Sequence, residues 1–290
     1  HLERIDAVVD EALKRAGISY QLSAVAVTQG PGLAIALEVG IKKAKEIALE
    51  HCLPLISVNH MEGHIYSTLS QNKNGNPKRE VAFPALCLLV SGGHTQLVFM
   101  KGHGEFELIG ETLDDACGEA LDKAAKILKL GYPGGPIIER LAQKGEPDFP
   151  LTRPLKEKTD LNFSYSGLKT QFLYLVENLN EEEFGQNIAN LAASFQEAAF
   201  EQLVRKTSFA IKMYQPKTLL CGGGVIANQR LRSLLRKLAR QEKITAYFPP
   251  VNKLIGDNAA MIGVAAGYKL QRKEFVENIE SLDRKPRMTL

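Results

Sequence analysis

Two histidines four residues apart, His60 and His64, have the spacing in this sequence that most suggests chemistry. Side chains at positions i and i+4 of a helix lie on one face, so both imidazoles could bind a single metal ion. A remote carboxylate such as Asp257 could complete a site of two histidines and one carboxylate. Such a site leaves coordination positions open for a substrate, although a histidine pair at this spacing also arises by chance.

The same pair raises a metalloprotease as an alternative. In that class the catalytic glutamate directly follows the first histidine. Here Glu62 comes two residues after His60, so we expect it on a different helix face from the imidazoles. The sequence therefore does not place it to activate a metal-bound water.

Glycine-rich turns follow two apolar segments, residues 88–90 and 219–221. Without a Cβ atom, glycine lets the backbone approach a ligand and point N–H groups at phosphate oxygens. Gly222, Gly223 and Gly224 also precede an expected helix, whose dipole would favour an anion. Tight turning alone is the alternative explanation, but two such turns together with the histidine pair favour a metal-assisted nucleotide site.

Acidic residues are concentrated in residues 110–123. Asp115 and Asp122 are seven residues apart, so we expect them to share a helix face and to be able to accept ribose hydroxyls. The alternative is that Asp114 or Asp115 caps the helix. The sequence leaves both explanations, ribose contact and helix capping, open.

Three further polar residues stand near expected helix starts. We expect Glu139 on the first turn of a helix that follows a proline–glycine turn, where the dipole stabilises it or where it contacts a ribose. Asp257 and Asn258 could cap the helix that begins at Ala259. Capping is thus the structural alternative to a metal role for Asp257.

Basic side chains cluster on an expected helix over residues 228–243 and in the C-terminal tail. This helix has a single acid, Glu242. RNA contact and simple solvation are the two explanations of such a face. The cations are Arg230, Arg232, Arg236, Lys237, Arg240 and Lys243 in the helix, and Lys269, Arg272, Lys273, Arg284, Lys285 and Arg287 in the tail.

Alternating strand and helix patterns predict an α/β fold with parallel strands, followed by an antiparallel meander over residues 85–110. The polar loop 71–80 suggests a boundary between lobes 1–80 and 81–290. We expect strands at 24–28, 55–58, 85–90, 96–100, 106–110, 218–221 and 246–248, helices at 2–17, 33–50, 118–130, 135–143, 188–211, 228–241 and from 259, and a loop at 144–159.

The chain as a whole has 290 residues and a formal net charge of +3, which permits a nucleic-acid partner without demanding one. Four scattered cysteines predict buried thiols rather than a disulfide framework. No apolar stretch is long enough to span a membrane, and no signal peptide is evident. Because the chain begins at His1 inside an amphipathic helix, we expect an N-terminal segment to be missing.

Seven ordered blocks together resemble the tRNA adenosine threonylcarbamoyltransferases, the TsaD family, whose older names are glycoprotease and O-sialoglycoprotein endopeptidase. The resemblance covers essentially the whole chain, and His94 after the glycine pair is similar to the bacterial and mitochondrial branch. The blocks are residues 60–64, 90–97, 114–123, 132–136, 163–170, 222–228 and 257–261.

This resemblance implies an actin-like, Hsp70-like ATPase (ASKHA) architecture with two lobes, of which the N-lobe is truncated here. It implies one divalent metal, iron or zinc, held by His60, His64 and Asp257. The residues matching the family's nucleotide contacts are Val90, Ser91, Gly92, Gly93, His94, Asp122, Gly135, Glu139 and Asn228, with Gly222, Gly223 and Gly224 as a further phosphate turn.

The implied reaction transfers the threonylcarbamoyl group of threonylcarbamoyl-adenylate to adenosine 37 of tRNAs that read codons beginning with A. Implied partners are tRNA with TsaB-like and TsaE-like proteins in bacteria, or a homodimer in mitochondria, in the cytoplasm or the mitochondrial matrix. Beside the metalloprotease, a non-catalytic nucleotide-binding scaffold stays open, because the expected N-terminal segment is absent.

Overall fold

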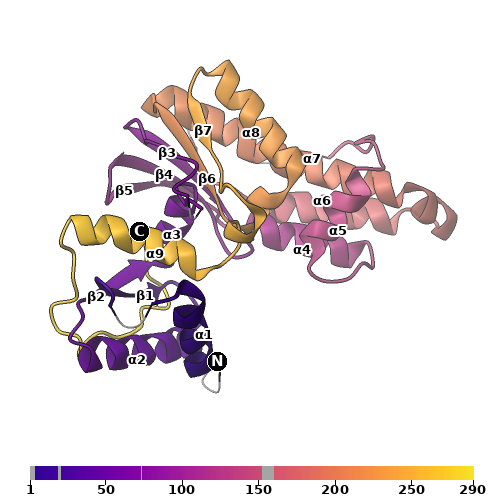
Figure 1. The fold of residues 1–290 in the computed structure, drawn as a ribbon. Coiled ribbons are helices and arrows are strands. Elements are labelled where there is room, and N and C mark those ends of the chain that lie inside the picture. Colours follow the sequence, from indigo (N-terminus) through magenta and orange to yellow (C-terminus); the bar gives the residue numbers. More distant parts are fainter. Residues whose placement is uncertain (1–3, 19–20, 73, 152–159) are drawn as a thin grey trace. The chain divides into compact units, whose positions relative to one another are not determined.

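The computed structural model describes residues 4–18, 21–72, 74–151 and 160–290. The chain forms two compact units, His1–Lys78 with Asp257–Leu290 (unit 1) and Arg79–Gly256 (unit 2) (Figure 1). We expected all of residues 81–290 in one lobe, but Asp257–Leu290 belongs to unit 1. The reason is that helix α9 (Ala259–Gln271) packs against α3 (His60–Ser67) and two strands of that unit.

Unit 1 is built on two parallel strands, β1 (Val25–Gly30) and β2 (Leu55–Asn59). Helix α2 (Ala34–Glu50) connects them, and its Ile41, Ala44 and Ala48 pack into a core with both strands. Helix α1 (Ile5–Ala16) precedes β1. Since β2 runs directly into α3, the strand fixes where the histidine helix begins.

Unit 2 contains a five-stranded sheet in the order β5-β4-β3-β6-β7. The predicted antiparallel meander is confirmed, while β6 and β7 run parallel to β3. Strand β3 is central and fully buried, which explains its unbroken apolar sequence. The strands are β3 (Ala85–Val90), β4 (Thr95–Gly102), β5 (Glu105–Glu111), β6 (Thr218–Gly222) and β7 (Thr245–Tyr247).

The described part of unit 2 also has five α-helices: α4 (Cys117–Ile127), α5 (Gly134–Ala142), α6 (Ser166–Glu177), α7 (Glu181–Tyr214) and α8 (Gln229–Gln241). Helix α7 contacts β3 and β4 as well as the other four helices (Figure 1). It begins earlier than the predicted residue 188 because Asn180 and Glu183 form a capping box. Helix α6 was not predicted, and residues 152–159 of the predicted loop lie outside the described residues.

Two 3₁₀ turns complete the element order, η1 (Gly224–Ala227) before α8 and η2 (Asn252–Leu254) before α9. In the described residues no helix is long and apolar enough to cross a membrane. Cys87, Cys117 and Cys221 are buried as predicted, whereas Cys52 is exposed.

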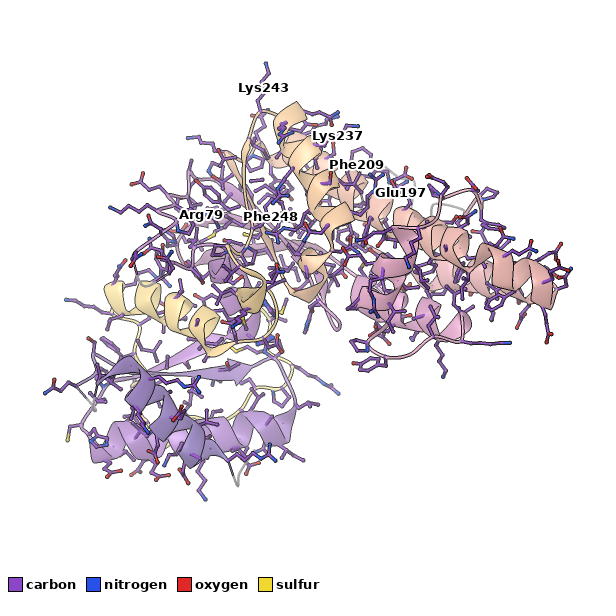
Figure 2. The ribbon with its side chains drawn as sticks, turned by 45° about the vertical axis from the view of Figure 1, so that its right-hand side comes forward. Arg79, Glu197, Phe209, Lys237, Lys243 and Phe248 are labelled. Carbon is purple, nitrogen blue, oxygen red and sulfur yellow. The ribbon has the colours of Figure 1, made fainter. Side chains whose placement is uncertain are left out.

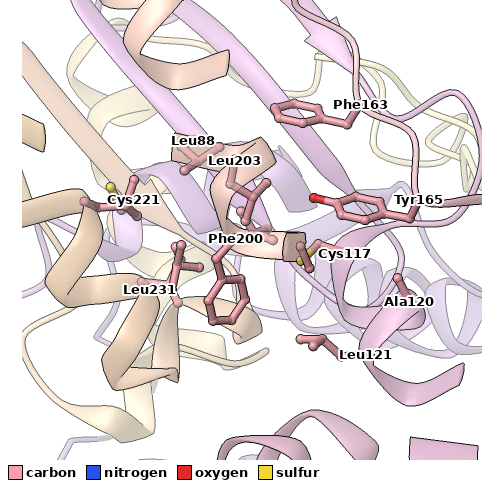
Figure 3. Packing of buried hydrophobic residues seen from close by; sticks show 14 of the residues in the cluster. Leu88, Cys117, Ala120, Leu121, Phe163, Tyr165, Phe200, Leu203, Cys221 and Leu231 are labelled. Carbon is pink, nitrogen blue, oxygen red and sulfur yellow. The ribbon is translucent and has the colours of Figure 1, made fainter. Parts of the chain in front are cut away.

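The buried core of unit 2 brings the two glycine turns together. Leu88 of β3, Cys221 of β6 and Phe200 of α7 belong to one cluster with residues of α4 (Figure 3). A Cβ atom on Gly223 would lie 2.4 Å from the Val90 carbonyl oxygen, and one on Gly118 would lie 2.6 Å from that of Ser91. The close approach of these backbones therefore requires glycine at both positions.

Candidate metal centre and nucleotide cavity

His60 and His64 lie on one face of α3, as predicted. The side chain of Asn59 caps this helix and accepts a hydrogen bond from the backbone N–H of Met61 at 2.8 Å. The Nε2 atoms of His60 and His64 lie 3.3 and 3.2 Å from the same oxygen, Oδ1 of Asp257. All three residues belong to unit 1, so one compact unit holds the whole triad.

Asp257 reaches the imidazoles because its neighbour caps the following helix. Asn258 accepts a hydrogen bond from the backbone N–H of Met261 at 2.9 Å, so the expected capping role falls to Asn258 alone. The adjacent imidazoles, His60 first and then His64, lower the pKa of Asp257 far below its ordinary range. An ionised carboxylate therefore faces two ring nitrogens.

The donor atoms have the spacing and chemistry of a metal site. Ligands about 2.1 Å from a tetrahedral ion lie about 3.4 Å apart, close to the distances measured here. Both ring nitrogens of His64 are buried without a hydrogen-bond partner of normal geometry. Because buried polar atoms are rarely left unsatisfied, the triad fits a cation such as zinc or iron(II).

Close packing of α3 on α9 holds the two histidines beside Asp257. A Cβ atom on Gly63 would lie 2.8 Å from Cδ1 of Ile262, so the helices approach closely at this point. The rings of Tyr66 and Tyr268 stack with their centroids 4.6 Å apart. The two histidines are therefore oriented by packing between helices, while Asp257 lies in the bend just before the N-cap of α9.

Glu62 lies between the histidines in sequence but pairs elsewhere. Its side chain is 4% exposed and lies 3.6 Å from Nζ of Lys269 and 3.9 Å from a guanidinium nitrogen of Arg272. Desolvation raises its pKa, and these two cations oppose the rise. The prediction that Glu62 is not the base of a protease agrees with these contacts.

A second candidate region is a cavity of about 250 Å³ in unit 2. Five residues of the predicted nucleotide set line it: Gly92, Asp122, Gly135, Glu139 and Asn228. Of the predicted phosphate turn, Gly224 lines it. Val90, Ser91, Gly93, His94, Gly222 and Gly223 are not among the lining residues; they belong to β3, β6 and the turns that follow them.

The polar side chains around this cavity also hold the fold together. Oδ1 of Asp122 accepts hydrogen bonds from the backbone N–H groups of Gly134 and Gly135, at 2.7 and 3.2 Å. Asn228 caps α8 and donates to Gln196 Oε1 at 2.7 Å. The cavity is therefore shaped by hydrogen bonds that join α4 to α5 and the start of α8 to α7.

The position of Glu139 corrects a prediction. We expected it on the first turn of α5, but it is the sixth residue of that helix. Its Oε1 accepts a hydrogen bond from the backbone N–H of Gln229 at 2.7 Å, at the start of α8. The helix dipole that stabilises Glu139 is thus that of α8 and not its own.

Comparison with known proteins identifies the family. The family model of TsaD, tRNA N6-adenosine threonylcarbamoyltransferase, matches residues 1–264. The chain belongs to the TsaD family. A relative of that name in Bacillus subtilis (strain 168) is 47% identical over 269 residues, covering 91% of this chain and 75% of its own. Another in Halalkalibacterium halodurans is 45% identical over 276 residues, covering 95% and 78%.

The fold agrees with this membership. The crystal structure of T.kodakarensis HypF is similar with a TM-score of 0.64 and 16% sequence identity, over 94% of this chain and 44% of that one. Full-length HypF in its phosphate- and nucleotide-bound form gives a TM-score of 0.62 at 15% identity, over 92% and 49%. This chain thus spans less than half of either HypF chain. The predicted α/β fold of the actin-like, Hsp70-like type and the predicted acyltransferase class are confirmed.

The acidic block of the TsaD resemblance has a different role from the one expected. Asp115 does not share a helix face with Asp122, because α4 begins only at Cys117, and neither Asp114 nor Asp115 caps it. Asp114 accepts hydrogen bonds from Ser164 Oγ and from the backbone N–H of Tyr165. This carboxylate therefore joins two TsaD blocks that lie about fifty residues apart.

Asp115 joins the same two blocks by ion pairs. Its Oδ1 lies 2.7 Å from Nζ of Lys123 on α4, and its Oδ2 pairs with Lys169 on α6. The sequence did not identify either lysine as an ion-pair partner of Asp115, because Lys169 is distant in the sequence and hydrophobic periodicity does not indicate ion pairs.

The basic helix of the predicted RNA surface is partly structural. Arg230 forms an ion pair with Glu197 at 2.7 Å. Arg232 is buried and lies over the ring of Phe248, 5.1 Å from its centroid, as does Arg236. Figure 2 shows Lys237 extending from this helix and Lys243 from the turn that follows it.

The cations of the C-terminal tail are also partly engaged. Lys269 and Arg272 pair with Glu62 and Glu274, and Arg284 pairs with Glu38 at 2.6 Å. Lys237 and Arg240 on α8 are exposed, as is Lys243 in the turn after it. The predicted footprint is therefore smaller than the sequence suggested.

Proposed function

We propose that this chain transfers the threonylcarbamoyl group of threonylcarbamoyl-adenylate to the exocyclic amine of adenosine 37 in tRNAs reading codons that begin with A. Family membership over residues 1–264 supports the reaction. The observation that carries the proposal in the structure is the convergence of His60, His64 and Asp257 on one point.

In the proposed site His60, His64 and Asp257 hold one divalent ion, iron or zinc. When bound, such an ion supplies Lewis acidity to carbonyl oxygens. Two imidazoles and one carboxylate would leave positions for oxygen atoms of the threonylcarbamoyl group. The chain supplies geometry here, because α3 and the turn before α9 hold the three donors before any ligand arrives.

The adenylate is proposed to bind in unit 2. Asp122 and Glu139 offer carboxylate oxygens to ribose hydroxyls, and Asn228 lies at the start of α8. The turn of Ser91, Gly92, Gly93 and His94 after Val90, and that of Gly222, Gly223 and Gly224, are proposed to present backbone N–H groups to the phosphate. These assignments rest on the family motifs and on the lining of the cavity.

The reaction breaks the bond between the carbamoyl carbon and the phosphate oxygen, and forms a bond from that carbon to the adenosine N6. AMP leaves with the electron pair of the broken bond, and N6 loses a proton to water. Backbone N–H groups at the phosphate would stabilise the leaving group. No covalent intermediate with the protein is needed.

The partners are proposed from the family as well. The acceptor is tRNA, and the bacterial relatives favour TsaB-like and TsaE-like proteins over the homodimer of mitochondrial members. The same relatives favour the bacterial cytoplasm over the mitochondrial matrix. The splayed base of an anticodon loop is the form in which RNA is usually read.

The test is threonylcarbamoylation of tRNA, followed by mass spectrometry of its nucleosides, with TsaB-like and TsaE-like proteins supplied. The proposal expects modification by the native chain and its loss in Asp257→Ala. His51→Ala, at the end of α2, is the matched histidine control and should retain activity. If Asp257→Ala modified tRNA normally, the metal role would be wrong. Binding of a threonylcarbamoyl-adenylate analogue without any transfer would favour the non-catalytic scaffold.

A further inference from the structure

A second cavity in unit 2 adjoins the proposed adenylate cavity. It has a volume of about 410 Å³ and is formed by α4 and the segment between α4 and α5. Asp122 and Tyr132 line both cavities, so these two side chains form a shared wall. The rest of its wall includes Glu119, Lys123 and Lys126.

Tyr132 is unusually exposed for an aromatic residue in a formed cavity. It is 85% exposed, more than any other large hydrophobic side chain that the structure describes. Tyr174 on α6, at 61%, lines neither of these two cavities. Exposed aromatic rings beside nucleotide sites are the surfaces on which single-stranded bases stack.

The charges around the second cavity suit a nucleotide rather than a free anion. Lys123 is already engaged by Asp115 and Glu119, at 2.7 and 2.9 Å. Lys126 lies one turn further along α4, is exposed, and forms no ion pair with any residue that the structure describes. One cation without an ion pair among the described residues and one open ring match the phosphate and the base of a nucleotide.

From these contacts we infer that the second cavity binds a nucleotide of the tRNA anticodon loop other than the acceptor, with its base stacked on Tyr132 and its phosphate beside Lys126. The inference rests on the proposed function, since it takes tRNA as the substrate. The shared wall places this nucleotide next to the bound adenylate, within the same unit.

The first experiment measures the affinity of an anticodon stem–loop RNA for Tyr132→Ala, Tyr132→Phe and Tyr174→Ala. Loss of one stacked base should weaken binding about 5- to 100-fold in Tyr132→Ala. Tyr132→Phe keeps the ring and should bind like the native chain, as should the control Tyr174→Ala. Native affinity in Tyr132→Ala would overturn the inference.

Stacking itself can be observed with 2-aminopurine placed at each loop position in turn. Quenching of its fluorescence on binding is expected at one position, lost in Tyr132→Ala and retained in Tyr132→Phe. Lys126→Gln should reduce the dependence of log affinity on log salt by about one. Quenching that persists in Tyr132→Ala would show that another group stacks the base.

A parallel titration separates this inference from the proposed function. A hydrolysis-resistant analogue of threonylcarbamoyl-adenylate should bind Lys126→Gln and the native chain equally without RNA, because Lys126 lines the second cavity and not the adenylate cavity. Equal losses of analogue and RNA affinity in this variant would assign Lys126 to the adenylate site and overturn the inference. If the native chain bound the stem–loop through Tyr132 but transferred nothing, the proposed function would fail while the base site remained.

Discussion

His64 in unit 1 and Asp122 in unit 2 are both polar residues of a candidate site, but their surroundings differ. The ring nitrogens of His64 are buried without a well-formed hydrogen bond. Oδ1 of Asp122 accepts two backbone hydrogen bonds. The donor atoms of the triad thus face one another and not the backbone, whereas the cavity is lined by a carboxylate that accepts hydrogen bonds from two backbone N–H groups.

This difference separates function from stability within one chain. A ligand removed from the triad leaves the packing of α3 on α9 in place, because Gly63 and the Tyr66–Tyr268 stack hold these helices together. A side chain removed from the cavity leaves backbone N–H groups of α5 or α8 without their acceptor. Variants in the two regions should therefore fail in different ways.

The largest effect is expected for His64→Ala. Loss of one of three protein ligands should weaken metal binding by more than about 100-fold. That factor is the upper end of the loss expected when a group that only hydrogen-bonds a metal ligand is removed. Metal titration by calorimetry measures this affinity. Because the His64 ring is buried, urea unfolding of the metal-free protein should show the cost of the cavity that its loss leaves. Native metal affinity in His64→Ala would contradict the metal role, and the contrast between the units would disappear.

Asp122→Ala should combine both kinds of failure. Two backbone N–H groups lose their acceptor, so the free energy of unfolding of unit 2 should fall by about 1–3 kcal/mol. Binding of the adenylate analogue should weaken as well, while metal affinity stays native. Asp122→Asn retains one acceptor oxygen and is the matched control. If Asp122→Ala weakened analogue binding but kept native stability, Asp122 would serve binding without stabilising the fold, and the two regions would not differ in this respect.

A smaller effect is expected for Glu62→Gln, which tests whether metal binding by the triad depends on the ion pairs that hold α3 against the α9 region. Glu62 fixes α3 against Lys269 and Arg272 of the α9 region, so its loss should weaken metal binding about 10-fold. Glu274→Gln removes an exposed carboxylate from the same two cations and is the control. Equal effects of both variants would indicate that general charge, and not helix position, sets the metal affinity.

Local patterns in the sequence predicted the elements and the histidine pair. The spacing of His60 and His64 depends only on helix geometry, and the buried runs of β3 and β6 need no distant partner to be recognised. Helix α6 was missed because no side chain caps its start and Gly167 stands in its first turn. Its Leu168, Phe172, Leu175 and Val176 do recur at helical spacing, a pattern that the prediction overlooked.

Partners far apart in the sequence could not be predicted. Asp114 and Asp115 find Ser164 and Lys169 about fifty residues later, which no spacing rule indicates. The assignment of Asp257–Leu290 to unit 1 depends on packing between α9 and α3, nearly two hundred residues apart. Tyr132 stood within a recognised block, but only its exposure singled it out.

The smallest effect concerns the acid stability of unit 2. Desolvation would raise the pKa of Asp115, but hydrogen bonds from Lys123 and Lys169 outweigh it and bring the pKa below its ordinary 3.8. A depressed pKa gives stability that is present above the ordinary value and lost as the pH falls through the folded one. The contribution should be no more than about 1 kcal/mol.

Asp115→Asn should therefore unfold with less dependence on pH below 4 than the native chain, as measured by urea unfolding at several pH values. Lys169→Met removes the other partner and should reduce the same acid dependence. In the double variant the two changes should not add, because Asp115→Asn already removes the ion pair with Lys169. Additive losses would show that Lys169 does not act through Asp115. The link between α4 and α6 beside the cavity would then not depend on this ion pair.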